Sequence, residues 1–137
     1  MINVTELRLG SVMMQKVNNR VTTVKCGYPH FDLVAREGTK DLYPVLLKAE
    51  VLADCGFQEN KDYPLLPAAR EFILVVPVMG SATTEIRGYV KNNGECFVRA
   101  SVNALPGSNN FFQLHQLQNL YFALTGEELS IRFSTRV

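Results

Sequence analysis

Cysteine and histidine are the side chains with which this chain of 137 residues could carry out covalent chemistry, and it has three cysteines and two histidines. Cys26 precedes His30 by four residues. Cys55, Cys96 and His115 are far apart in the sequence, so only the fold could bring them together. A cysteine nucleophile needs a base within hydrogen-bonding reach, which makes a small enzyme with a Cys–His pair one hypothesis. Free cysteine is more often a small buried hydrophobic residue, and we favour that interpretation for all three.

Motifs for cofactor or metal chemistry are absent from the sequence. It contains no GxxxxGK[ST] phosphate loop, no GxGxxG turn, no HExxH, CxxC or EF-hand spacing, and no GxSxG elbow. The adjacent carboxylates Glu127 and Glu128 would point apart after a helix, so we interpret them as a solvated turn. We therefore predict no cofactor and no metal, and we assign no catalytic residue.

An amide-rich helix face is the strongest candidate for a site. Between residues 111 and 125 the polar positions are uncharged, whereas exposed helix faces usually carry Lys and Glu. This candidate interaction face consists of His115, Gln116, Gln118 and Asn119. Its amides could hydrogen-bond a partner or ligand. Alternatively, the face packs under a loop and satisfies that loop's backbone groups, which is the interpretation we favour.

Composition and charge narrow the class of protein. Apolar residues make up 47% and charged residues 20%, as in an ordinary globular domain. Fourteen Lys and Arg against thirteen Asp and Glu give a net charge of +1, so nothing demands a nucleic-acid partner. No apolar run approaches the roughly 18 residues of a membrane span. The N-terminus lacks the pattern of a signal peptide, and we expect a cytoplasmic protein without a membrane partner.

The elements that would position these residues begin with a β-hairpin. Residues 11–17 and 20–26 are rich in Val, Met and Thr, and Asn18-Asn19 between them can form a two-residue turn. Residues 27–40 hold Gly, Pro, Asp and Thr, which predicts a loop around one short strand at 31–35. Pro44 suits a first helical turn, and helical spacing then predicts a helix that ends before Gly56. Residues 58–70 are polar and contain two prolines, which favours a flexible connection.

The second half of the chain predicts more strands and the amide-bearing helix. The apolar run at residues 71–78 predicts a strand covered on both faces, which ends or lies at an edge near Pro77. Residues 85–91 and 95–102 predict a hairpin around Asn92-Asn93-Gly94. Asn110 is predicted to cap the helix, with Gln113 completing a capping box and Gly126 ending it. Alternation at residues 129–134 predicts a half-buried strand.

The predicted helix at residues 111–125 has an apolar stripe opposite its amides. Leu114, Leu117, Tyr121 and Leu124 follow helical spacing. Phe111, Phe112 and Phe122 either extend the core or expose a binding edge, and of these two interpretations we favour the core. Helices and hairpins are segregated along the chain, which favours an α+β fold with a mostly antiparallel sheet. We predict one domain over residues 1–137, with sub-structures at 1–60 and 71–137, and consider a small SH3-like barrel for the first hairpin.

The segment HQLQNLYFALTGEELSI, residues 115–131, closely resembles the C-terminal signature of a family of small uncharacterised proteins from Bacteroides-type gut bacteria, their phages and mobile elements. The opening TELRLGSVM, residues 5–13, is similar to the start of that family. LKAEVLADCGFQEN, residues 47–60, is similar to its helix ending in "GF", whereas residues 61–107 match no part of it. The resemblance implies a cytoplasmic accessory protein of phage or mobile-element origin, and it implies no mechanism.

These observations lead to one hypothesis and two alternatives. We favour a non-catalytic binding or interaction module with a protein partner whose identity, like the oligomeric state, the sequence does not give. One alternative is a nucleic-acid-associated accessory factor, which a clustered basic surface would favour. The basic residues that suggest it are Arg20, Lys25, Arg36, Lys40, Arg87 and Lys91. The other alternative is the small Cys–His enzyme.

Overall fold

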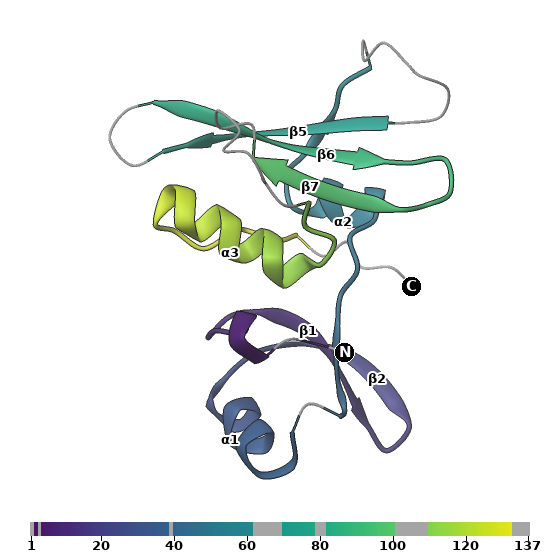
Figure 1. Ribbon diagram of the computed structural model, residues 1–137, viewed down its shortest axis with the longest axis vertical. Coiled ribbons are helices and arrows are strands. Elements are labelled where there is room, and N and C mark those ends of the chain that lie inside the picture. The colour runs from purple at the N-terminus through teal and green to yellow at the C-terminus, as the bar shows by residue number, and fades with distance from the viewer. Residues whose placement is uncertain are drawn as a thin grey trace.

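Helix α3 (Leu114–Thr125) lies between two antiparallel sheets in the computed structural model of the chain (Figure 1). The structure describes residues 2, 4–38, 40–61, 70–78, 82–100 and 110–132. Its mixture of helices with antiparallel sheets confirms the α+β class. The four-stranded sheet covers one side of α3, and the N-terminal strands lie on the other side.

The N-terminal sheet has three strands in the order β2-β1-β3. These are β1 (Val12–Val17), β2 (Arg20–Lys25) and β3 (Leu42–Pro44). The 3-10 helix η1 (Val4–Glu6) precedes β1, and helix α1 (Tyr28–Glu37) connects β2 to β3. Over the residues described, this sheet does not close into a barrel, unlike the SH3-like barrel that we considered.

The second sheet has four strands in the order β4-β5-β6-β7. Short helix α2 (Ala49–Asp54) and helix α3 pack on one of its faces (Figure 1). The strands are β4 (Gln58–Glu59), β5 (Arg70–Pro77), β6 (Thr83–Val90) and β7 (Cys96–Ala100). Gly88 lets α2 approach β6 closely, because a Cβ atom there would lie 2.7 Å from Cδ1 of Leu52.

Both predicted hairpins are confirmed, through different turns. Asn18 and Asn19 have φ angles of 52° and 64°, as a two-residue type I′ turn requires. In the second hairpin only Gly94 takes a positive φ, of 88°. The Gly94 N–H donates to the Lys91 carbonyl at 2.9 Å, and the Lys91 N–H donates to the Glu95 carbonyl at 2.8 Å. The turn is therefore a three-residue loop ending in a left-handed glycine, rather than a turn in which Asn93 is also left-handed.

Three predicted elements differ from the structure. Residues 28–37 form helix α1, not a loop with a strand at 31–35. Pro44 ends strand β3, and the following helix begins only at Ala49. Residues 129–132 form no strand, although Leu129 is buried and the Arg132 N–H donates to the Asp54 carbonyl at 2.7 Å. The rest of that segment, and residues 62–69 of the predicted flexible connection, lie outside the described residues.

The outer face of strand β5 is only partly buried, contrary to our prediction of a strand covered on both faces. Phe72 and Val76 point into the core, whereas Val75 on the other face is 62% exposed. The strand ends at Pro77, as predicted. Helix α3 begins at Leu114 with Gln113 as its N-cap and Gln116 completing the capping box, three residues later than the Asn110 cap that we expected. Gly126 ends the helix in the left-handed conformation with φ of 74°.

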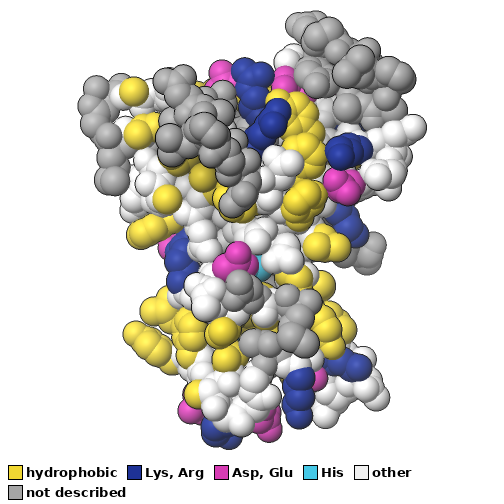
Figure 2. Space-filling view, in the orientation of Figure 1, with side chains coloured by type: hydrophobic (Ala, Val, Ile, Leu, Met, Phe, Trp, Pro, Cys, Tyr) yellow, Lys and Arg dark blue, Asp and Glu magenta, His cyan; other side chains and the backbone are white. Residues whose placement is uncertain are grey.

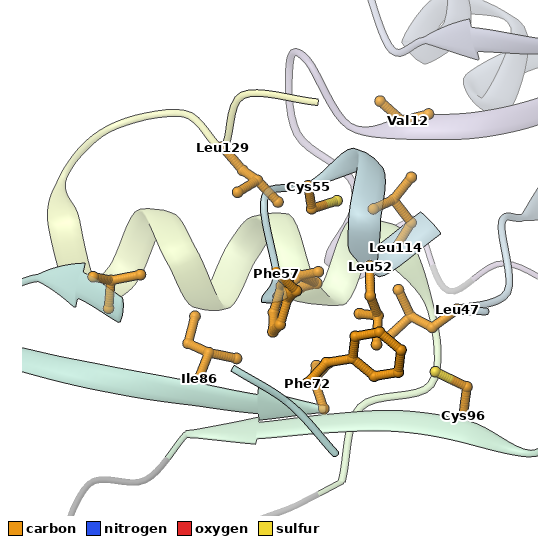
Figure 3. Packing of buried hydrophobic residues seen from close by; sticks show 13 residues of the cluster. Val12, Leu47, Leu52, Cys55, Phe57, Phe72, Ile86, Cys96, Leu114 and Leu129 are labelled. Carbon is orange, nitrogen blue, oxygen red and sulfur yellow. The ribbon is translucent and has the colours of Figure 1, made fainter. Parts of the chain in front are cut away.

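The hydrophobic residues form two clusters. The larger one joins α2, α3, the four-stranded sheet and Val12 of β1, and its members Leu114 and Leu117 are fully buried. Figure 3 shows this cluster, with Val12 and Leu114 labelled. The smaller one joins α1, the N-terminal sheet and the residues on either side of η1, and its buried members are Ile2, Leu7, Met13, Cys26 and Leu42. Helix α2 thus packs with the four-stranded sheet, and so does Val12 of β1.

Candidate functional site

All four residues of the candidate interaction face contact the segment 6–12, which connects η1 to β1. Nε2 of His115, a fully buried residue, lies 3.0 Å from a carboxylate oxygen of Glu6. The Gln116 side chain donates to the other Glu6 oxygen at 3.1 Å. Burial alone would raise the pKa of the Glu6 carboxyl, but the hydrogen bonds from His115 and Gln116 lower it below its ordinary value.

Gln118 and Asn119 bind the backbone of the same segment. The Gln118 amide accepts from the Val12 N–H at 2.7 Å and donates to the Gly10 carbonyl at 3.0 Å. The Asn119 amide donates to the Glu6 carbonyl at 2.8 Å and accepts from Nε of Arg8 at 2.7 Å. These bonds are the ones that a face packed under a loop would make, so the geometry favours that interpretation over a free binding face.

Arg8 reinforces this contact between α3 and the N-terminal segment. Its guanidinium donates to the Gln118 carbonyl at 2.9 Å, forms an ion pair with Glu128 and lies over the ring of Phe122. Phe122 nevertheless remains 42% exposed, and Phe112 is 39% exposed. The prediction that both rings extend the core is therefore wrong, whereas Phe111 packs against the larger cluster.

The three cysteines are free and buried. Burial raises the pKa of all three thiols. The pKa of Cys96 is raised to about 11 and that of Cys55 to about 12. Thiols in such surroundings are protonated near neutral pH and are poor nucleophiles. The Nδ1 atom of His30 accepts from the Gly27 N–H at 2.9 Å, and Nε2 of His115 is bonded to Glu6. The positions of the cysteines and histidines thus give the Cys–His hypothesis no support.

A buried carboxylate on the outer face of the four-stranded sheet was missed by the sequence analysis. The Glu71 side chain is 2% exposed. It accepts from the Asn60 amide at 2.9 Å and from Nη1 of Arg87 at 3.4 Å, and it is hydrogen-bonded to Tyr89. Burial alone would raise its pKa, but these partners lower it below the ordinary value. Arg87 also pairs with Glu85, so one guanidinium is shared between two carboxylates.

An open apolar groove of about 500 Å³ crosses one face of the N-terminal sheet. Two of its lining residues, Val21 and Leu46, are 54% and 56% exposed. In Figure 2 hydrophobic side chains are exposed in both halves of the molecule, and in the lower half they lie beside Lys and Arg. The groove is lined by Met14, Val21, Tyr43, Pro44, Leu46 and Gln113. A smaller cleft of about 160 Å³ shares Leu46 and continues to Phe112, so the apolar surface extends toward the four-stranded sheet.

Comparison with known proteins gives no relative from which a role could be transferred: no family model, no curated protein and no solved structure matches the chain. Over the part of the chain that is described, no helix has the length and apolar character that crossing a membrane requires. Within the same residues, no group of three or more His, Cys, Asp or Glu is placed to hold a metal ion.

Proposed function

We propose that this protein is a non-catalytic binding module whose binding surface is the apolar groove of the N-terminal sheet. The observation that carries the proposal is the gathering of half-exposed apolar side chains around one groove, with Val21 and Leu46 both more than half exposed. Burying such side chains against a partner is favourable, because apolar area is removed from water. Binding pockets are typically concave and mostly apolar, with a few polar groups at their margins.

The side chains that an enzyme would use support a catalytic function less than the groove supports a binding function. The thiols are buried and carry raised pKa values. The amide face is engaged with the N-terminal segment. A nucleic-acid role also has less support, since Arg36, Arg87 and Lys91 form ion pairs with Asp32, Glu85 and Glu95. We further propose a cytoplasmic location and a phage or mobile-element origin, on the strength of the resemblance and of the free thiols.

A capture experiment with matched variants tests the groove. The groove variant carries Val21→Glu and Leu46→Glu, and the control carries Val75→Glu, which changes an equally exposed apolar residue on the other sheet. Each tagged protein is incubated with a lysate of the organism that encodes it, and captured proteins are quantified by mass spectrometry. We expect a partner that the wild type and the control retain and the groove variant loses. Equal recovery of every captured protein by all three chains would contradict the proposal.

A further inference from the structure

The hairpin beside the groove carries an unbalanced positive charge. Residues 11–26 contain Lys16, Arg20 and Lys25 and no Asp or Glu. None of these three cations forms an ion pair with a described residue. Five other described cations, Arg8, Arg36, Arg70, Arg87 and Lys91, do form ion pairs, whereas Lys40, Lys48, Lys61, Arg99 and Arg132 do not, so what sets the hairpin apart is that it has no carboxylate of its own. The three cations of the hairpin are therefore available to a ligand.

The strand register places two of these cations on the face that forms the groove. Lys16 lies opposite Val21, and Lys25 lies opposite Val12. Directly opposed residues of an antiparallel pair point to the same face, and residues two apart along a strand share it. On β1, Met14 lies between Val12 and Lys16 on this face, and Met14 lines the groove. Lys16 therefore lies beside the groove, and Lys25 lies farther along the same sheet face, where it lines a second pocket with Val12 and Gln118.

Strand β2 adds a free edge to this surface. Among the described strands it is one of the two outer strands in the order β2-β1-β3, and all but one of its six residues are exposed. An edge strand presents unpaired backbone N–H and C=O groups on which an extended chain can add. A second copy of β2 would fit this edge poorly. If two copies paired antiparallel along their full length, Arg20 of one copy would lie opposite Lys25 of the other, and the like charges would repel. The same two cations attract an acidic segment.

We propose that the occupant of the groove is an extended acidic segment of a partner protein, which adds as a strand beside β2. Its apolar side chains would lie against Val21 and the groove, and its carboxylates would pair with Lys16, Arg20 and Lys25. Charges at the rim of an interface mainly set partner choice and association rate, whereas the buried apolar contacts hold the complex. This inference rests on the proposed function, because it requires the groove to be the binding surface.

Selection from a library of short random peptides displayed on phage tests the inference. The wild-type chain is the target, and peptides that also bind the Val21→Glu/Leu46→Glu variant are removed. We expect the remaining sequences to combine apolar residues with an excess of Asp and Glu. Selected peptides without an acidic excess would overturn the acidic partner and leave the groove intact as a site. A selection that yields no groove-dependent peptide would instead count against the proposed function.

Charge reversal gives the matched control. Lys16→Glu with Lys25→Glu should weaken a selected peptide by about tenfold or more and shift a repeated selection toward Lys and Arg. Arg36→Glu with Lys61→Glu changes the net charge by the same amount, at residues that do not line the groove. This control should leave the affinity within about twofold, since isolated exposed charges contribute little. Equal weakening by both pairs would overturn the inference.

Two further measurements separate other occupants. Sedimentation of the wild type alone detects a dimer, and a dimer that the groove variant dissociates would assign the groove to a second copy and overturn the inference. Fluorescence anisotropy with oligothymidylate detects single-stranded DNA. DNA binding that the Lys16 and Lys25 reversals abolish, and that the groove substitutions leave unchanged, would identify the hairpin as a phosphate-binding surface and overturn the inference as well. A monomeric protein that does not bind oligothymidylate would support the inferred acidic partner.

Discussion

At the scale of single residues, Gln118 uses both ends of its amide to bind the backbone on either side of Ser11. It is 3% exposed, and it accepts from the Val12 N–H and donates to the Gly10 carbonyl. A buried polar group that loses its partner costs the desolvation that the bond had offset. The loss of stability on removing Gln118 would therefore include the cost of leaving two buried backbone groups without a partner, in addition to the loss of the two bonds.

Gln118→Ala should lower the free energy of unfolding by about 1–3 kcal/mol, because a buried N–H and a carbonyl lose their partner. Equilibrium denaturation in urea, followed by circular dichroism, measures this change. Gln58→Ala removes the same group from an exposed position on β4 and should change stability by less than about 0.5 kcal/mol. If the two variants lost equal stability, Gln118 would not have the role that its contacts indicate.

Glu71 gives a second residue-scale prediction, in acid. Its pKa is lowered in the folded protein, so its contribution to stability is complete above the ordinary glutamate pKa of about 4.3 and is lost as pH falls through the folded value. Glu71→Gln should cost about 1–3 kcal/mol at neutral pH. The difference between wild type and variant should shrink as the pH falls below about 4. Urea unfolding across a pH series checks this, and a difference independent of pH would contradict it.

The Glu71 network could not have been found from sequence. The run EFILVVPV is typical of a buried strand, and nothing near Glu71 in the sequence indicates its partners. Those partners come from β6 and from the residue after β4, which only the sheet order brings together. The groove was missed for the same reason, because Met14, Val21 and Tyr43 lie on three strands whose pairing the sequence did not fully predict.

At the scale of elements, turns and helix ends were easier to predict than helix starts. Asn18-Asn19 and Gly94 carry local backbone preferences, so both hairpins and the end of α3 at Gly126 followed from them. Helix α1 was missed because its first residues include Pro29, which we read as part of a loop. Proline is tolerated in a first helical turn, and the spacing of Phe31 and Val34, which pack on the smaller cluster, was the available signal.

Helix α3 depends on its apolar stripe for its place under the four-stranded sheet. Leu117 is fully buried in the larger cluster. Leu117→Ala should therefore cost about 2–5 kcal/mol through lost transfer energy and the cavity left behind. Phe122→Ala truncates a larger side chain at an exposed position of the same helix, and should cost less than about 1 kcal/mol. Thermal unfolding of both variants tests the assignment, which fails if Leu117→Ala leaves the transition unchanged.

At the scale of the whole molecule, α3 belongs to both halves at once. Its stripe fills the larger cluster, and its amides bind the segment that leads into β1. Because one helix completes both parts, opening either part exposes groups that the other part had satisfied. We therefore expect the two halves to unfold in one transition rather than independently.

Two cysteines report on this coupling. Cys26 lies in the smaller cluster and Cys55 in the larger one, and both are 3% exposed. In chains that retain only one of them, pulsed labelling with a thiol reagent across a urea series should give the same midpoint for each. Labelling should be slow in the absence of urea, since both thiols are buried and have raised pKa values. A midpoint for Cys26 well below that for Cys55 would show that the halves unfold separately.

The order of the elements along the sequence has a consequence for synthesis on the ribosome. The hydrogen bonds from the amides of α3 span 106 to 113 residues, so the backbone groups of Gly10 and Val12 have no α3 partner until that helix has been made. Contacts of such long range are formed late, after the entropy of a long loop has been lost. During translation the edge of β2 and the apolar face of the N-terminal hairpin therefore remain exposed until α3 has been made. A chain that terminates before Leu114 leaves both sheets without the helix that they share.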